Sequence, residues 1–459
     1  MISEEIVKAL KKIVGKENVL LGEEAGEEYM HDEALTAKAI KPDIVVKPGN
    51  VEEVSKILRL ANNYRISVTP RGGGTGLSGG CIAASGGIML SLERMNKILE
   101  IDEKNHVAVV EAGVTLSELY RAVENHGLCY PIYPGEATAT IGGNVATNAG
   151  GMKAVKYGVT RHFVLGLEAV LPTGEVISTG GKFVKSSTGY DLTQLLIGSE
   201  GTLAVITKVI LKLLPLPKFS SMLFIPFKNL NDAIQATPAI IKSGIIPVAI
   251  EFIEKFDLIL LENYTGKKVP ISRDVREKSE AFLLIIIEGR NFEEAIKDAE
   301  LIGDVCLSHG ALDVYIPDTE KAKQDLLEIR SKHFYAIKDA GAKDMVDVVV
   351  PRGEIPRFVN QVYKIGEKYN VTIRCVGHAG DGNVHLYVIG GKDDKLPELF
   401  REIYITGKML GGTLSGEHGI GLEKRRYFLE LEDKTKIELM RKIKKVFDPN
   451  NILNPGKIF

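Results

Sequence analysis

Apolar and polar positions alternate along the first part of the chain in short segments, so that strands and amphipathic helices follow one another. The pattern predicts helices over residues 3–10 and 51–63 and strands over residues 43–46 and 66–69. Pro48-Gly49-Asn50 supplies a turn and a cap for the second helix. The chain therefore opens with a β-α-β unit.

A second group of apolar segments continues as far as a natural boundary at Pro215-Leu216-Pro217. Residues 134–151 show little apolar periodicity and carry many small side chains, so this stretch is either a linker or a binding site. We expect a helix over residues 115–124 and strands over residues 87–92, 106–111, 165–171 and 201–214.

Beyond Pro217 glycines become fewer, and strands alternate with longer helices. This order of elements predicts an α+β domain built on an antiparallel sheet. The expected strands are residues 222–227, 247–251, 281–288 and 311–315, and the expected helices are residues 230–241 and 292–309. A last helix over residues 434–447 precedes a turn-rich tail.

The composition is that of a globular protein with several domains. At about 150 residues per domain, 459 residues predict two to four of them. Apolar residues make up 44% and charged residues 26% of the chain, so sizeable cores can form. The 58 Lys and Arg against 60 Asp and Glu leave a net charge of −2, which argues against a nucleic-acid partner. The 47 glycines exceed the average of about 7% and are clustered.

The four cysteines, Cys81, Cys129, Cys306 and Cys375, form no C-x-x-C pair. They fit neither an iron–sulfur cluster nor a disulfide framework, and buried free thiols are expected. The N-terminus lacks the order of a signal peptide, and no apolar run approaches the roughly 18 residues of a membrane span. We therefore expect a cytoplasmic protein that can be peripheral to a membrane through a partner.

The first glycine cluster, Gly74-Thr75-Gly76-Leu77-Ser78-Gly79, follows a predicted strand and matches the dinucleotide-binding pattern G-x-G-x-x-G. That pattern requires a helix to begin at the glycines, whereas here the chain continues into the strand expected at residues 87–92. A Rossmann site is therefore disfavoured. A nest of backbone N–H groups for an anion such as a pyrophosphate is favoured over a plain flexible loop.

Two more segments combine glycine with small or hydroxyl side chains, residues 134–151 and residues 198–207. Small residues let backbone approach a flat ligand, and Thr and Asn supply hydrogen bonds. Either segment alone could be an ordinary loop. Three such segments in one domain predict a large, elongated ligand.

These segments resemble a known family. Pro70-Arg71-Gly72-Gly73-Gly74-Thr75-Gly76, Thr140-Ile141-Gly142-Gly143-Asn144 and Gly198-Ser199-Glu200-Gly201-Thr202-Leu203 are similar to the FAD-binding domain of the vanillyl-alcohol oxidase / p-cresol methylhydroxylase flavoproteins. The resemblance implies two α+β subdomains around FAD. The first loop carries no His for covalent attachment, so FAD is expected to be noncovalent. The implied FAD-binding residues are Arg71, Gly72, Gly73, Gly74, Thr75, Gly76, Ser78, Pro134, Gly135, Thr140, Gly142, Gly143, Asn144, Glu200, Gly201, Ile206 and Asn454.

A histidine pair lies in Gly377-His378-Ala379-Gly380-Asp381-Gly382-Asn383-Val384-His385. Asp381-Gly382 is a favoured pair for a two-residue hairpin loop. In that hairpin His378 and His385 stand directly opposite each other, with Cβ atoms about 4.5–5.5 Å apart, close enough to reach one metal ion. The alternative is two surface histidines beside a turn.

A further candidate ligand is Glu417, in Ser415-Gly416-Glu417-His418-Gly419-Ile420-Gly421. Two imidazoles and a carboxylate with open positions make a catalytic zinc-type site, and iron or manganese also fit these ligands. His418 would lie near the metal, where an imidazole with an unperturbed pKa of about 6.5 suits a general base. The alternative is a polar turn.

The His378–His385 and Ser415–Gly421 motifs and the tail from Phe447 to Lys457 extend the resemblance to FAD-linked D-2-hydroxyacid dehydrogenases of the D-lactate dehydrogenase and glycolate oxidase flavoprotein type. The resemblance implies His378, His385 and Glu417 as metal ligands and His418 as the base. It also implies Arg330 as the group that binds the substrate carboxylate, although a surface Arg on a helix is the alternative reading.

The resemblance divides the chain into an N-terminal helical segment (residues 1–40), an FAD-binding domain (41–217), a substrate or cap domain with the metal-site hairpin (218–410) and a C-terminal segment returning to the FAD domain (411–459). Two positions depart from the 2-hydroxyglutarate enzymes of this family. Met345 stands where they have a Lys, and Tyr387 where they have an Asn. Both departures favour a smaller acid such as lactate or glycolate.

The expected function is oxidation of a D-2-hydroxy acid to the 2-oxo acid. Without cysteine clusters, electrons must pass to an external acceptor, which could be an electron-transfer flavoprotein, an iron–sulfur subunit, a quinone or a cytochrome. A homo- or hetero-oligomer is compatible with this expectation. The alternatives are a metal-free flavoprotein that oxidises another alcohol and a noncatalytic flavin subunit of an electron-transfer complex.

Overall fold

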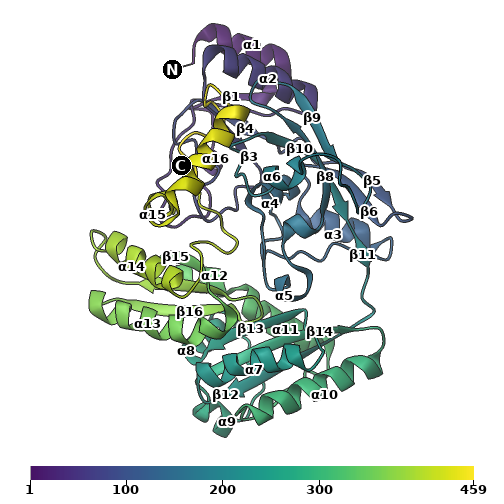
Figure 1. The fold of residues 1–459 in the computed structure, drawn as a ribbon, viewed down its shortest axis with the longest axis vertical. Helices are drawn as coiled ribbons and strands as arrows, with labels where there is room; N and C mark the ends of the chain where they lie inside the picture. The colour runs from purple at the N-terminus through teal and green to yellow at the C-terminus, as the bar shows by residue number, and fades with distance from the viewer. Residues whose placement is uncertain (1) are drawn as a thin grey trace. The chain divides into compact units, whose positions relative to one another are not determined.

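The computed structural model describes residues 2–459, and the chain forms two compact units (Figure 1). Unit 1 contains residues up to 149, residues 159–216 and residues 417–459. Unit 2 contains residues 150–158 and 217–416. In the described part of the chain no helix is long and apolar enough to cross a membrane.

Unit 1 begins with a four-stranded sheet of order β1-β2-β4-β3, in which β2, β4 and β3 run parallel. The strands are β1 (Val19–Leu21), β2 (Ile44–Val46), β3 (Val68–Arg71) and β4 (Ile88–Ser91), with helices α1 (Glu4–Val14) and α2 (Val51–Tyr64) and the 3₁₀ turns η1 (Lys16–Asn18) and η2 (Glu27–Tyr29). The side chain of Asn50 caps α2 by accepting the N–H of Glu53, which confirms the predicted cap.

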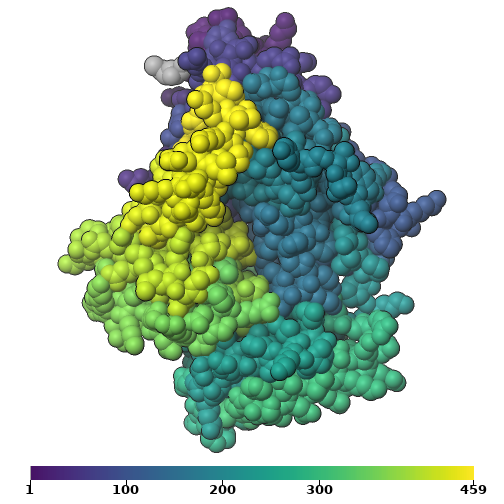
Figure 2. All heavy atoms as spheres, viewed as in Figure 1, coloured from purple at the N-terminus to yellow at the C-terminus, as the bar shows by residue number. Residues whose placement is uncertain are grey.

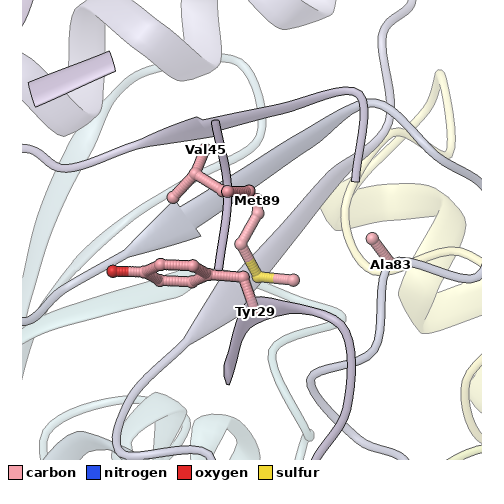
Figure 3. Close-up of a cluster of buried hydrophobic side chains, with 5 residues drawn as sticks. Tyr29, Val45, Ala83 and Met89 are labelled. Atoms are coloured by element: carbon pink, nitrogen blue, oxygen red, sulfur yellow. The ribbon is translucent and has the colours of Figure 1, made fainter. Parts of the chain in front are cut away.

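A small buried cluster packs on this first sheet (Figure 3). Val45 of β2 and Met89 of β4 meet Tyr29 of η2 and Ala83 of the long glycine-rich connection between β3 and β4. The connection leads into β4 and not into a helix, so it lacks the strand-to-helix geometry of a Rossmann site. Burial of Ala83 in this cluster holds the part of the connection nearer to β4 in place.

The second sheet of unit 1 is fully antiparallel, with the order β5-β6-β10-β8-β9. Its strands are β5 (Ile98–Asp102), β6 (Val107–Glu111), β8 (Val164–Val170), β9 (Val176–Gly180) and β10 (Val205–Lys212). A two-stranded ladder of β7 (Leu128–Cys129) and β11 (Leu214–Pro215), helices α3 (Leu116–Glu124), α4 (Ile141–Thr147) and α6 (Leu192–Leu196) and the turn η3 (Thr160–His162) complete this part.

The C-terminal segment returns to the first sheet of unit 1. After α15 (Arg425–Leu431) and α16 (Lys434–Phe447), Leu453 forms a parallel bridge with Val68 of β3. The buried ammonium of Lys444 donates to the carbonyl oxygens of Thr202 and Leu453. The outer face of α16 is exposed, and its atoms are yellow in Figure 2.

Unit 2 is built on a six-stranded antiparallel sheet of order β12-β14-β13-β16-β17-β15. An antiparallel sheet was predicted from the order of elements beyond Pro217. The strands are β12 (Phe219–Phe227), β13 (Ala249–Glu254), β14 (Ala281–Gly289), β15 (Ala342–Val349), β16 (Thr372–His378) and β17 (Asn383–Ile389). Helices α7 and α10 pack against β12–β14, and α13 and α14 against β15 and β16.

The helices of unit 2 are α5 (Ala154–Tyr157), α7 (Leu230–Lys242), α8 (Lys255–Thr265), α9 (Arg273–Lys278), α10 (Phe292–Ser308), α11 (Glu320–Ser331), α12 (His333–Asp339), α13 (Ile355–Tyr369) and α14 (Leu396–Met409), with the turn η4 (Arg352–Glu354).

Three expectations need correction. Residues 311–315 form only two isolated bridges, to Phe227 and Phe224, because Pro226 between them has no N–H to extend the ladder. Residues 134–151 contain the helix α4, which the sequence pattern did not predict. All four cysteines are free, but only Cys306 and Cys375 are buried, whereas Cys81 and Cys129 are partly exposed.

Candidate functional site

The first two glycine-rich segments lie against each other in unit 1. A Cβ built on Gly72 would stand 2.2 Å from Oγ1 of Thr140, and one on Gly73 would stand 3.0 Å from the carbonyl oxygen of Thr138. The Thr140 hydroxyl also caps α4 by accepting the N–H of Gly143. Side chains at these glycines would push the two segments apart, so the close backbone approach requires glycine.

The third segment rests on the same helix. Gly198 and Glu200 donate their backbone N–H groups to the carbonyl oxygens of Val145 and Ala146 in α4. Asn454 of the tail donates from its side-chain amide to the carbonyl oxygens of Gly80 and Glu200. All three predicted segments and Asn454 are therefore brought together within unit 1.

The β16–β17 hairpin of unit 2 has a different register from the predicted one. His378 pairs with Asn383, and His385 pairs with Val376, so the two histidines are diagonal and not directly opposite. The loop contains four residues. Gly380 donates its N–H to the carbonyl oxygen of Ile250, and Gly382 donates its N–H to the carbonyl oxygen of His378. Both imidazoles still lie on one face of the sheet, and their Nε2 atoms are 3.3 Å apart.

Glu251 of β13 lies directly across the sheet from His378 and is fully buried. Its Oε1 is 2.6 Å from Nδ1 of His378, and its Oε2 accepts from Nε and Nη2 of Arg330 at 3.0 and 2.6 Å. Burial raises the pKa of Glu251, but its interactions and hydrogen bonds with His378 and Arg330 outweigh burial and hold that pKa below its usual value. Arg330 is thus buried beside the histidine pair and is not a surface residue of α11.

Asp347 of β15 is, after Glu251, the second buried carboxylate at this place that sequence reasoning missed. It pairs with His385 in the sheet, and a carboxylate oxygen of Asp347 and a ring nitrogen of His385 lie within 4.8 Å. A signal was available, since Asp347 interrupts the apolar run from Val346 to Val350, as Glu251 interrupts Ile250 and Phe252. A buried carboxylate in such a run requires a polar or charged partner.

Asp347 contacts the segment Ser415-Gly416, which is followed directly by Glu417 and His418. Oδ2 of Asp347 accepts the Ser415 hydroxyl and the Gly416 N–H at 2.8 and 3.0 Å. Gly416 is the last residue of unit 2, and Glu417 begins the final segment of unit 1. Consecutive Cα atoms are about 3.8 Å apart, so the covalent chain itself holds Glu417 close to this anchor.

Within unit 1, two of the residues expected to bind cofactor hold the turn that contains His418. The Ser78 hydroxyl donates to the carbonyl oxygens of His418 and Gly419. The buried carboxylate of Glu200 accepts the N–H groups of Ile420 and Gly421, both at 2.7 Å. Burial raises the pKa of Glu200. The Glu200 carboxylate thus positions this turn.

The comparisons with known proteins agree with both units. Residues 42–180 match the family described as FAD binding domain, and residues 216–458 match the family described as FAD linked oxidases, C-terminal domain. The chain belongs to the FAD-linked oxidases. The match to the C-terminal domain alone covers more than half of the chain.

Three relatives match this chain over nearly its whole length. An uncharacterized FAD-linked oxidoreductase of Mycobacterium tuberculosis is 45% identical, covering 99% of both chains. The D-lactate dehydrogenase of Anaerostipes hadrus is 41% identical, covering 100% of this chain and 98% of its own. The glycolate oxidase subunit GlcD of Bacillus subtilis is 39% identical, covering 100% and 97%.

A solved structure supports the fold. The crystal structure of p-cresol methylhydroxylase with substrate bound matches with a TM-score of 0.80 and 20% identity, covering 99% of this chain and 96% of that one. The predicted fold class is confirmed: an FAD-binding domain of the p-cresol methylhydroxylase type and an oxidase domain with an antiparallel sheet.

The residues of the FAD-binding domain fit such a cofactor. The side-chain amide nitrogen of Asn144 is buried and has no hydrogen-bond partner among residues 2–459, so it can donate to a ligand. Gly74 has a φ of +72° in the loop beside Arg71, a conformation that lets backbone N–H groups converge on an anion. Arg71 itself is held by the carbonyl oxygen of His31. These features suit a ligand with a pyrophosphate and several acceptor atoms.

The remaining residues implied by the resemblance fall on the same framework. Gly142 packs on Ala112 of the β6–α3 connection. A Cβ on Gly201 would lie 3.3 Å from Cγ of Pro70. Ile206 is buried in β10. Gly135 has a φ of +90° and is open around its Cα. Their contacts with FAD stay a prediction, as do those of Thr75, Gly76 and Pro134.

Proposed function

We propose that this FAD-linked oxidase oxidises a small D-2-hydroxy acid, D-lactate or glycolate, to the 2-oxo acid. The observation that carries the proposal is the buried array in unit 2, in which two facing imidazoles adjoin an arginine that shares a carboxylate with one of them. Relatives named D-lactate dehydrogenase and glycolate oxidase subunit, at 41% and 39% identity, support it.

The donor set fits a divalent metal. His378 and His385 present Nε2 atoms 3.3 Å apart, and neutral imidazole is a good ligand for zinc, iron or manganese. The carboxylate on Nδ1 of His378 is the usual second partner of a metal-binding histidine. We propose His378, His385 and Glu417 as ligands, with zinc as the preferred metal, because Glu417 follows directly on the Gly416 anchor.

Each residue has one task in this proposal. Arg330 binds the substrate carboxylate, and Nη1 of Arg330 makes no hydrogen bond within residues 2–459. His418 accepts the proton of the α-hydroxyl group. When bound, noncovalent FAD would supply the hydride acceptor and the metal would polarise the hydroxyl group. Holding acid, base and acceptor in one geometry supplies much of the rate.

Two buried positions support a monocarboxylic acid as the substrate. Met345 and Tyr387 are direct partners across β15 and β17, and both are nearly inaccessible. An apolar side chain and a phenol at this place offer no cation to a second carboxylate. A monocarboxylic acid is therefore proposed over a dicarboxylic one.

We also propose that the electrons leave to an external acceptor, an electron-transfer flavoprotein, an iron–sulfur subunit, a quinone or a cytochrome. The four free cysteines lie apart in the sequence and in different elements, so they offer no cluster of their own. A partner could also place the enzyme at a membrane surface in the cytoplasm.

The test is anaerobic bleaching of the flavin absorbance by a panel of D- and L-2-hydroxy acids. D-lactate or glycolate should bleach the purified yellow protein, and the L-acids should not. His418→Ala should keep its FAD but lose turnover, and near-normal turnover would refute the base assignment. Failure of every 2-hydroxy acid to bleach the flavin would favour a noncatalytic flavin subunit. Activity that persists after chelation would favour a metal-free alcohol oxidase.

A further inference from the structure

Glu251 bonds both to a proposed metal ligand and to the proposed carboxylate-binding residue. Its two oxygens are divided between them: Oε1 serves His378 and Oε2 serves Arg330. The carboxylate is fully buried, and β13 pairs Glu251 with His378 through the backbone as well. Nothing in the glycine or histidine motifs of the sequence points to this residue.

The bond to His378 sets which ring nitrogen carries a proton. An ionised carboxylate can only accept, so Nδ1 of His378 must donate. The lone pair of that imidazole is then on Nε2, the atom that faces Nε2 of His385. Without Glu251, the proton could move to Nε2 and remove the ligand atom from the site.

The bonds to Arg330 set the orientation of its guanidinium. Nε and Nη2 both point at Oε2, so the planar fork is fixed along one edge and Nη1 is left for another anion. Arg330 is only 9% exposed, and a buried guanidinium requires such a partner. The Glu251 carboxylate therefore both neutralises and orients the Arg330 guanidinium.

We propose that Glu251 is a positioning residue that prepares the metal ligand and the carboxylate-binding arginine together. The proposal rests on the proposed function. Loss of Glu251 weakens binding of metal and of substrate in parallel, whereas loss of Arg330 weakens binding of substrate alone. Outer partners of metal ligands typically contribute roughly 10- to 100-fold in metal affinity.

The experiment compares four folded variants with the wild type: E251M, which removes the acceptor oxygen, R330M, the double variant E251M/R330M and, as a control on the same strand, E254Q. Zinc affinity is measured without substrate, by equilibrium dialysis against buffered Zn²⁺ and elemental analysis. KM and kcat for D-lactate are measured at saturating zinc. The double variant avoids the unpaired buried charge that could unfold E251M.

E251M and the double variant should bind zinc roughly 10- to 100-fold more weakly than the wild type. R330M should bind zinc within about threefold of the wild type but show a raised KM, and E254Q should match the wild type in both measurements. Wild-type zinc affinity in the folded double variant, or an equal loss in R330M, would overturn the positioning role alone. A wild-type protein that binds no zinc would overturn the proposed metal site as well.

Discussion

Nε2 of His385 faces Nε2 of His378 at 3.3 Å, although the two residues are not partners in the β-ladder. Two imidazole nitrogens at this distance can share a proton or a cation. With Nδ1 of His378 bonded to Glu251, a shared cation is the arrangement that suits both rings.

Removal of the metal, or His385→Ala, should therefore abolish flavin reduction by the 2-hydroxy acid. Lost polarisation of the hydroxyl group is worth several kcal/mol, a factor of about 100 or more in rate. The measurement is the anaerobic rate of flavin bleaching, with the FAD content determined in parallel. His309→Ala, on an exposed position at the end of α10, is the matched control and should behave as the wild type. Full activity of a metal-free His385→Ala protein would rule out the shared cation.

Glu200 should control the rate through the turn that contains His418. Its two oxygens accept two backbone N–H groups, and the amide of Glu200→Gln can accept only one of them. The lost charge-assisted bond is worth about 1.5–3 kcal/mol. We expect a lower kcat and a lower melting temperature with FAD retained.

The control for this variant is Glu168→Gln on β8, where Thr207 can still donate to the side-chain oxygen. Equal kcat values for Glu200→Gln and Glu168→Gln would show that the turn does not depend on Glu200.

Met345 and Tyr387 should determine which acids are oxidised. Placing Lys at position 345 and Asn at 387 gives a second carboxylate a cation and a donor, worth about 1.5–3 kcal/mol for a bond to a charged group. In the double variant the ratio of kcat/KM for D-2-hydroxyglutarate over D-lactate should rise about tenfold or more. The conservative variant Met345→Leu should leave the ratio unchanged. A folded double variant with the wild-type ratio would show that these positions do not contact the substrate.

Glu254 should make unit 2 less stable as pH rises from about 4.5 to about 7. Burial raises the pKa of Glu254 from 4.5 to about 7, while Tyr363 donates to its carboxyl group. Between those values the folded state holds a proton that the unfolded state has released, so folding becomes less favourable as pH increases.

At pH 8 the ionised Glu254 costs up to about 3 kcal/mol. Glu254→Gln should therefore stabilise the protein at pH 8, by about 1–3 kcal/mol, and change little at pH 4.5. Urea unfolding at the two pH values measures the difference. An equal effect of the substitution at both values would contradict the raised pKa.

Local signals predicted much of this fold. Helix α16 begins and ends where its pattern predicts, and Asn50 and Thr115 cap α2 and α3 as residues of their type commonly do. The alternation of strands with longer helices beyond Pro217 likewise predicted the antiparallel sheet of unit 2. These features depend on residues close together in the sequence, so one sequence suffices to find them.

The errors arose where distant segments decide the structure. Asp381-Gly382 favours a two-residue loop, but Gly380 is drawn to Ile250 and would clash with Val155 if it carried a Cβ. Likewise α4 has two glycines in its first turn and forms because Gly142 packs closely on Ala112. Glu251 and Asp347 were missed because their partners come from other strands and helices. Spacing within a motif carries no information about such contacts.

The pairing of Val68 with Leu453 has a consequence for biosynthesis. Val68 donates to Ile452 and accepts from Asn454, so the first sheet of unit 1 gains its last neighbour from a segment translated after all of unit 2. On the ribosome, unit 2 can finish folding while the earlier unit still waits for this segment. A chain terminated before residue 452 would expose the open side of β3, and chaperones and proteases would meet it as an incomplete product.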